Sequence, residues 1–309
     1  TGLRCDYSQL TSLDVTQNTS LTYLFLYENQ LTSLDVSQNT ALDFLECSYN
    51  QLIILDVSQN IALKSLDCNY NQLTSLDVTQ NVALENIYCN SNQLTSLDVT
   101  QNVALGYINC SYNELTSLNV TQNVSLYKFE CSNNQLISLD VSQNSALIFL
   151  KLNENQLTSL DVSQNVALME LECSNNQLSS LDVTQNVALN TLHCMDNQLT
   201  NLDVSQNLNL VMLSCASNQL TSLDVTQNSR LTNLYCGGNQ LTSLFIKNNN
   251  QYWIDLVFDE NPNLEYVCAN ENDLVLVQQK IIDYGYTNCH ANSYCSFVPG
   301  GLFYTLQGN

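Results

Sequence analysis

Apolar residues recur along this chain with a period of 21 residues, and each period consists of two similar halves. In the segment 31–51, LTSLDVSQNTALDFLECSYNQ, the first half reads LxxLxVxxN and the second LxxLxCxxN. Counted from Leu31 as position 1, apolar residues fall at positions 1, 4, 6, 12, 15 and 17, and Asn falls at 9 and 20. Such a period indicates a solenoid, in which each coil buries its apolar residues against its neighbours.

The alternation of apolar and polar residues in L-x-V and L-x-C is typical of short β-strands. Neither half has the run of about ten residues with helical periodicity that a helix requires. We therefore predict a β-rich solenoid of about 12 coils of 21 residues. Each coil is expected to have a short extended segment on both sides and no convex helix.

The repeated pattern LxxLxCxxNxL resembles the leucine-rich repeat family over essentially the whole chain. The 21-residue spacing and the LDV[ST]QN half are similar to bacterial secreted or cell-surface proteins of that family. The resemblance implies a right-handed solenoid that serves in binding or adhesion outside the cell. Leu3 and Cys5 occupy positions 15 and 17 of an incomplete first coil, so we expect a monomeric fragment of a longer multidomain protein.

Two repeated columns are assigned to the interior. Position 17 holds Cys in most coils, but Leu26 and Leu152 in two, and a free Cys is a small buried hydrophobe. Parallel Cβ vectors disfavour disulfides along this column, and a straight row of thiols does not converge on zinc. Asn at position 20 is expected to satisfy backbone groups where the chain turns inward, with stacked copies satisfying one another.

Position 5 is Asp in most coils and is expected to face solvent. Two interpretations remain open. Each Asp accepts hydrogen bonds from Ser or Thr hydroxyls and N–H groups of the following turn, or Ca²⁺ ions lie between successive carboxylates. We favour the first, because Ca²⁺ loops gather several ligands from one segment. The candidate Ca²⁺ column comprises Asp35, Asp56, Asp77 and Asp98.

Positions 14, 16 and 18, which we call the variable face, change in chemistry from coil to coil. Exposed aromatic residues there are typical of protein anchors and sugar-stacking platforms, although cross-strand pairing that only stabilises the sheet is the alternative. The strongest group, with Tyr49 at its margin, lies near the N-terminus. The predicted ligand-binding residues are Tyr23, Phe25, Tyr27, Phe44, Glu46, Asp67, Tyr88, Tyr107, Lys128, Lys151 and Tyr235.

The predicted function is non-catalytic recognition of a protein or glycan, without a cofactor. Glu172, His193 and Ser214 stand in acid–base–nucleophile order in successive coils, but a triad also needs an oxyanion hole and a water-poor site. An alternative is that the uniform Ser-Asp-Thr face binds a periodic target such as ice, mineral or a Ca²⁺ array.

Charge and hydropathy exclude two classes of partner. The 309 residues include 29 Asp and Glu but only 7 Lys and Arg, for a net charge of −22. Nucleic acid requires a basic surface, so it is excluded as a ligand. No segment reaches the roughly 18 consecutive apolar residues of a transmembrane helix, so membrane insertion is not expected.

The repeat decays after Leu241. We predict a solenoid over 1–255 and a final coil and cap over 256–309, with a helix at about 273–283 that is stopped by Gly285 and a hairpin at about 295–306. Asn272 and Asp273 are expected to open the helix. After one shortened coil, positions 4, 6, 9, 12 and 15 are expected at Leu256, Phe258, Asn261, Leu264 and Val267.

In that register Cys268 takes position 16 and faces outward. We predict a disulfide between Cys268 and Cys289 across the helix, in an oxidising extracellular compartment, and Cys289–Cys295 is the alternative.

Overall fold

The computed structural model describes residues 1–250 and 252–295. The chain forms two compact units, Thr1–Leu178 and Ser179–Asn309. The division into a solenoid over 1–255 and a cap over 256–309 stays a prediction.

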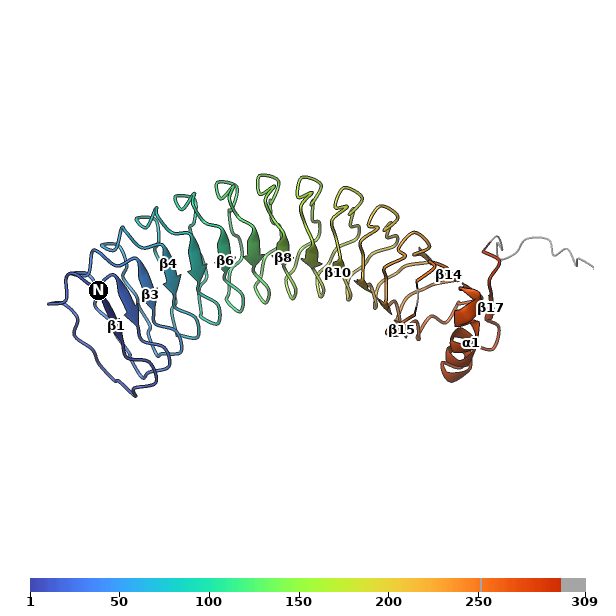
Figure 1. Cartoon of the computed structure of the whole chain (residues 1–309), viewed down its shortest axis with the longest axis horizontal. Coiled ribbons are helices and arrows are strands. Elements are labelled where there is room, and N and C mark those ends of the chain that lie inside the picture. Colours follow the sequence, from blue (N-terminus) through green and yellow to red (C-terminus); the bar gives the residue numbers. More distant parts are fainter. Residues whose placement is uncertain (251, 296–309) are drawn as a thin grey trace, which may run out of the picture. The chain divides into compact units, whose positions relative to one another are not determined.

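The first unit is built on a parallel sheet of short strands that succeed one another in chain order (Figure 1). Each residue pairs with the residue 21 positions later, as Leu24 does with Leu45. From the third strand onward the central residue is buried and its two neighbours are half-buried. The strands are Gly2–Arg4 (β1), Tyr23–Phe25 (β2), Phe44–Glu46 (β3), Ser65–Asp67 (β4), Asn86–Tyr88 (β5), Tyr107–Asn109 (β6), Lys128–Glu130 (β7), Phe149–Lys151 (β8) and Glu170–Glu172 (β9).

All these strands lie in the L-x-C half of the coil, so among the described residues of the first unit the expected extended segment in the L-x-V half does not form a strand. The L-x-V half still points inward, and Val36 is fully buried. Its amides bond within the coil, however: Ser37 N–H donates to Asp35 Oδ1 (2.9 Å) and Asn39 N–H donates to the Val36 carbonyl (2.9 Å). A parallel ladder needs bonds between coils instead.

The second unit contains strands of two parallel sheets. The L-x-C strands are Thr191–His193 (β10), Met212–Ser214 (β11), Asn233–Tyr235 (β13) and Asp255–Val257 (β15). The other sheet is parallel and consists of Ser222–Asp224 (β12), Ser243–Phe245 (β14), Tyr266–Cys268 (β16) and His290–Asn292 (β17). The chain therefore has slightly more coils than the predicted 12.

The predicted register of the last coil is wrong by half a repeat. Leu256 pairs with Leu234, which is at position 15, and Val267 pairs with Leu244, which is at position 4. Asn261 bonds the backbone as an Asn at position 20 does, with its Oδ1 accepting from the Leu241 N–H (3.1 Å). Because both halves read LxxLx[VC]xxN, a half-repeat shift leaves the apolar pattern unchanged, and no coil is shortened.

The predicted helix is confirmed as Leu274–Asp283 (α1), preceded by a 3₁₀ turn at Glu271–Asp273 (η1). Val277 and Ile281 are its buried residues, and Gly285 follows it with a φ of 75°. Asp273 is the N-cap residue of α1, as expected, although its side chain forms no capping hydrogen bond. The predicted hairpin lies outside the described residues from residue 296 onward.

The disulfide joins Cys268 to Cys295, with Cα atoms 5.3 Å apart, so the predicted Cys268–Cys289 pair is wrong, as is the alternative. Cys268 ends β16 opposite Asn292, the last residue of β17, and is fully buried rather than outward-facing. Because β16 and β17 are parallel, both strands end on the same side. Cys295 comes shortly after the end of β17 and so lies near Cys268, whereas Cys289 comes before β17 begins. Burial raises the pKa of the Cys289 thiol to about 12.

The two interior columns are confirmed. Cys89, Cys110 and Leu152, all at position 17, are fully buried. Asn113, at position 20, donates from Nδ2 to the carbonyls of Cys89 (3.0 Å) and Cys110 (3.0 Å), and its Oδ1 accepts from the Leu94 N–H (2.9 Å). These partners are backbone groups, so stacked Asn side chains do not satisfy one another as expected.

Candidate binding face

The aromatic group predicted near the N-terminus is assembled in part. Phe25 on β2 and Phe44 on β3 lie with their ring centroids 5.2 Å apart. The Arg4 guanidinium lies 4.3 Å from the Phe25 centroid and 3.2 Å from an Asp6 carboxylate oxygen. Tyr23 is 45% exposed, so it is available to a ligand.

A second aromatic row lies beside this group and includes two tyrosines that the sequence analysis missed. The ring of Tyr27 makes edge contacts with Tyr7 (5.1 Å) and Tyr49 (5.2 Å), and Tyr49 stacks on Tyr70 (4.2 Å between centroids). Tyr7, Tyr49 and Tyr70 occupy position 19, where φ is near 50° in successive coils. Gly and Asn tolerate this left-handed conformation better than Tyr does.

The signal for this row in the sequence is the recurrence of Tyr at position 19, whereas the left-handed backbone there is known only from the structure. Position 19 precedes the Asn column, and it holds Tyr in several coils where a small polar residue would be less strained. The row Tyr7–Tyr27–Tyr49–Tyr70 extends the exposed aromatic surface of the first unit.

Glu46 and Asp67 lie in register on β3 and β4. Each carboxylate accepts a local bond: Glu46 Oε1 from the N–H of Ser48 (3.0 Å), and Asp67 Oδ1 from the N–H of Asn69 (3.1 Å). Burial, followed by the charge of Glu46, raises the pKa of Asp67 to about 7. Two neighbouring, half-buried carboxyl groups without a cation thus occupy the centre of the predicted site.

The next strands hold Tyr88 and Tyr107, whose ring centroids are 4.8 Å apart. The ammonium of Lys128 lies 4.4 Å from the Tyr107 centroid and 3.0 Å from Glu130. Desolvation raises the pKa of both tyrosines. Lys128 is therefore positioned by a ring and a carboxylate rather than extended into solvent.

Lys151 on β8 is held by two carboxylates of β9. Its Nζ lies 2.8 Å from Glu170 and 2.7 Å from Glu172, and Asn153 Nδ2 donates to Glu172 (2.6 Å). Although burial opposes it, these carboxylates raise the pKa of Lys151. The positive charge of Lys151 is thus already paired with carboxylates of the same sheet.

The remaining candidates lie in the second unit. The hydroxyl of Tyr235 donates to Asp255 Oδ2 (2.8 Å). His193 Nε2 lies 3.0 Å from the sulfur of Met212, and Ser214 Oγ lies 3.6 Å from the sulfur of Met195. Neither the candidate base nor the candidate nucleophile is arranged as in a catalytic triad.

The Asp column forms the local bonds that we favoured. Asp14 Oδ1 accepts from the N–H (2.9 Å) and hydroxyl (2.7 Å) of Thr16, and Asp77 makes the same pair of bonds with Thr79. These bonds lower the pKa of both carboxyl groups. Within residues 1–250 and 252–295, no group of three or more His, Cys, Asp or Glu side chains is placed to share a metal ion.

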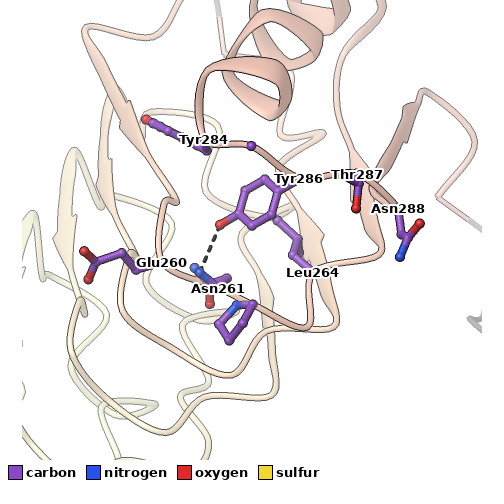
Figure 2. A pocket seen from close by; sticks show the side chains of 9 residues that line it. Glu260, Asn261, Leu264, Tyr284, Tyr286, Thr287 and Asn288 are labelled. Carbon is purple, nitrogen blue, oxygen red and sulfur yellow. Dashed lines mark hydrogen bonds between the residues drawn. The ribbon is translucent and has the colours of Figure 1, made fainter.

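A pocket of about 340 Å³ lies in the cap (Figure 2). The hydroxyl of Tyr286 accepts from the Asn261 N–H (3.0 Å) and donates to the Phe258 carbonyl (2.7 Å). Both bonds of the Tyr286 hydroxyl, the polar group in the middle of the pocket, therefore connect the segment after α1 to the last coil. No helix in the described part of the chain is long and apolar enough to cross a membrane.

In-register parallel strands, one in each coil, with buried Leu, Cys and Asn columns, define the leucine-rich repeat class. The chain is a leucine-rich repeat protein with 21-residue spacing, and its solved structural neighbours include bacterial proteins of this class.

The functional domain of InlJ from Listeria monocytogenes, which includes a cysteine ladder, is 37% identical with a TM-score of 0.79, over 94% of this chain and 62% of that chain. A leucine-rich repeat protein of Leptospira interrogans is 26% identical with a TM-score of 0.70, over 92% and 81% of the two chains. An internalin, InlF of Listeria monocytogenes, is 20% identical with a TM-score of 0.74, over 86% of each, and shows the fold alone. No protein-family model and no curated protein matches the chain.

Proposed function

We propose that this chain is a non-catalytic binding or adhesion module that acts outside the cell and recognises a protein or glycan through its variable face. The observation that supports this proposal is the contrast between the two faces of the coil. The Asp column uses its oxygens in the turns of its own coil, whereas the variable face carries the exposed ring of Tyr23 beside the half-buried rings of Phe25 and Phe44. Exposed aromatic clusters of this kind are typical of binding surfaces.

The resemblance to bacterial secreted and cell-surface leucine-rich repeat proteins supports the extracellular setting. The Cys268–Cys295 disulfide is consistent with an oxidising compartment, since disulfides are rare in reducing ones. The chain spans 62% of the InlJ chain, so a role within a longer protein is part of the proposal.

An array of immobilised extracellular proteins and glycans tests the proposal. The wild-type chain and the variant Phe25→Ala/Phe44→Ala are applied in parallel, with circular dichroism to verify that the variant folds. We expect specific capture of at least one protein or glycan by the wild-type chain and loss of that capture in the variant. Capture that is equally strong with both proteins would contradict the assignment of the binding site.

A further inference from the structure

The variable face carries a four-residue row in which two carboxylates lie between two aromatic side chains. Strand pairing places Phe25 beside Glu46, Glu46 beside Asp67, and Asp67 beside Tyr88. We call this row the acidic cradle. Its members come from the adjacent strands β2 to β5, so they are spaced by about 4.8 Å from one strand to the next.

The two carboxylates of the acidic cradle have no cationic partner among the described residues, although the Arg4 guanidinium lies over the Phe25 ring at one end of the row. The four basic residues of the first unit are all paired elsewhere: Arg4 with Asp6, Lys64 with Asp43, and the other two, as described above, with Glu130, Glu170 and Glu172. Neither Glu46 nor Asp67 forms an ion pair with a described residue. The raised pKa of Asp67 is the consequence expected for like charges placed together and partly desolvated.

The ring of Tyr88 at one end of the row is also suited to a cation, and the ring of Phe25 at the other end already has the Arg4 guanidinium over it. Each π-face carries negative electrostatic potential, so a Lys ammonium or an Arg guanidinium is attracted to Phe and Tyr rings as well as to carboxylates. The same chemistry occurs within the chain itself, where Arg4 lies over Phe25 and Lys128 lies over Tyr107.

We propose that the acidic cradle binds an exposed Lys or Arg side chain of a partner protein, with the cation between Glu46 and Asp67 and its aliphatic stem against Tyr88. This inference rests on the proposed function and narrows it, because it identifies the partner as a protein with a basic surface residue. A neutral glycan would leave the two carboxylates without a counter-charge. Arg is favoured over Lys for a site with two acceptors, because its guanidinium binds carboxylates in a bidentate manner.

A capped hexa-arginine peptide is the probe, with a capped hexa-citrulline peptide as its uncharged counterpart, and binding is measured by isothermal titration calorimetry. At pH 8, where Asp67 with its pKa of about 7 is mostly ionised, the variant Glu46→Gln/Asp67→Asn removes the two cradle charges. Its matched control, Asp35→Asn/Asp56→Asn, removes two charges from the exposed Asp column and leaves the same net charge. Circular dichroism checks both folds, and the two single cradle variants are measured as well.

We expect hexa-arginine to bind the cradle variant about tenfold more weakly than the wild-type chain, and the control variant within about twofold, because only contacts at the bound site are lost. Hexa-citrulline should not bind. Equal losses in both double variants would overturn the inference, since binding would then follow net charge alone. Hexa-citrulline binding as strong as that of hexa-arginine would also overturn it. The proposed function would survive either result if array capture still depends on Phe25 and Phe44.

Discussion

Asp67 lies directly beside Glu46 in the β3–β4 pair, and partial burial together with the charge of this neighbour raises the pKa of Asp67 to about 7. An unfolded chain would titrate this carboxyl near 4. The folded state therefore binds the proton more tightly, and the free energy of unfolding falls as pH rises from about 4 to about 7. Below about pH 4 the carboxyl is protonated in both the folded and the unfolded state, so it no longer lowers the free energy of unfolding.

Asp67→Asn should remove this pH dependence, because the amide is neutral throughout. We expect the variant to gain stability over the wild-type chain as pH rises from 4 to 8, by on the order of 1–4 kcal/mol at the upper end. Urea denaturation at several pH values measures the difference. Asp56→Asn is the control: Ser58 lowers the pKa of Asp56, so its difference from wild type should be constant between pH 5 and pH 8. A flat Asp67→Asn difference would contradict the raised pKa.

Asn113→Ala tests the Asn column. The substitution removes the partners of one buried N–H group and two buried carbonyls. We expect a loss on the order of 3–5 kcal/mol, because buried unsatisfied groups each cost about 1–3 kcal/mol. Gln93→Ala, at an exposed position of the same region, is the control and should change stability by less than about 0.5 kcal/mol. A similar small loss for Asn113→Ala would show that the column is dispensable.

Apart from Cys5 in the incomplete first coil, the thiols of the Cys column should be unreactive while the chain is folded. Cys89 is fully buried, and burial raises its pKa well above the usual value, whereas Cys5 is partly exposed. Since only the accessible thiolate reacts, iodoacetamide at pH 8 should label Cys5 and leave Cys89 unmodified until urea unfolds the chain. Peptide mapping by mass spectrometry distinguishes the two sites. Rapid labelling of Cys89 in native buffer would contradict its interior position.

Calcium titration tests the alternative interpretation of the Asp column. Because Asp14 and Asp77 already accept two bonds each within their own turns, we expect no increase in the thermal midpoint at millimolar Ca²⁺. A rise of several degrees that is lost in Asp35→Asn/Asp56→Asn would instead support cation binding between successive carboxylates.

The repeat made much of the fold predictable, because a column that accepts only apolar residues over many coils must be interior. Leu152 takes the place of Cys in the Cys column, which indicates an apolar interior position, and the full burial of Leu152 confirms that the column is interior. The same regularity makes the register of the last coil ambiguous, because the two halves of a repeat resemble each other. Leu256 and Val267 fit either half, and only strand pairing distinguishes the two registers. The error in register then misplaced Cys268 and its disulfide partner.

The placement of the candidate residues on one face was predictable, but the contacts between their side chains were not. Positions 14, 16 and 18 follow from the alternation of the strand, so Phe25, Phe44 and Glu46 could be placed on one face. The stacking of Tyr49 on Tyr70 depends on the left-handed backbone at position 19, which no hydrophobic pattern reports. The basic residues of the first unit pair with other carboxylates and leave Asp67 and Glu46 without a cation. This too could be predicted only from side-chain positions.

The most direct test of the account compares the two faces of the coil against one ligand captured on the array. Surface plasmon resonance gives the dissociation constants of the wild-type chain, Phe25→Ala/Phe44→Ala and Asp35→Asn/Asp56→Asn. The account predicts that the variable-face variant binds at least about tenfold more weakly, because buried aromatic anchors dominate binding free energy, while the Asp-column variant stays within about twofold of wild type. The opposite pattern, with binding lost only in the Asp-column variant, would contradict the assignment of recognition to the variable face.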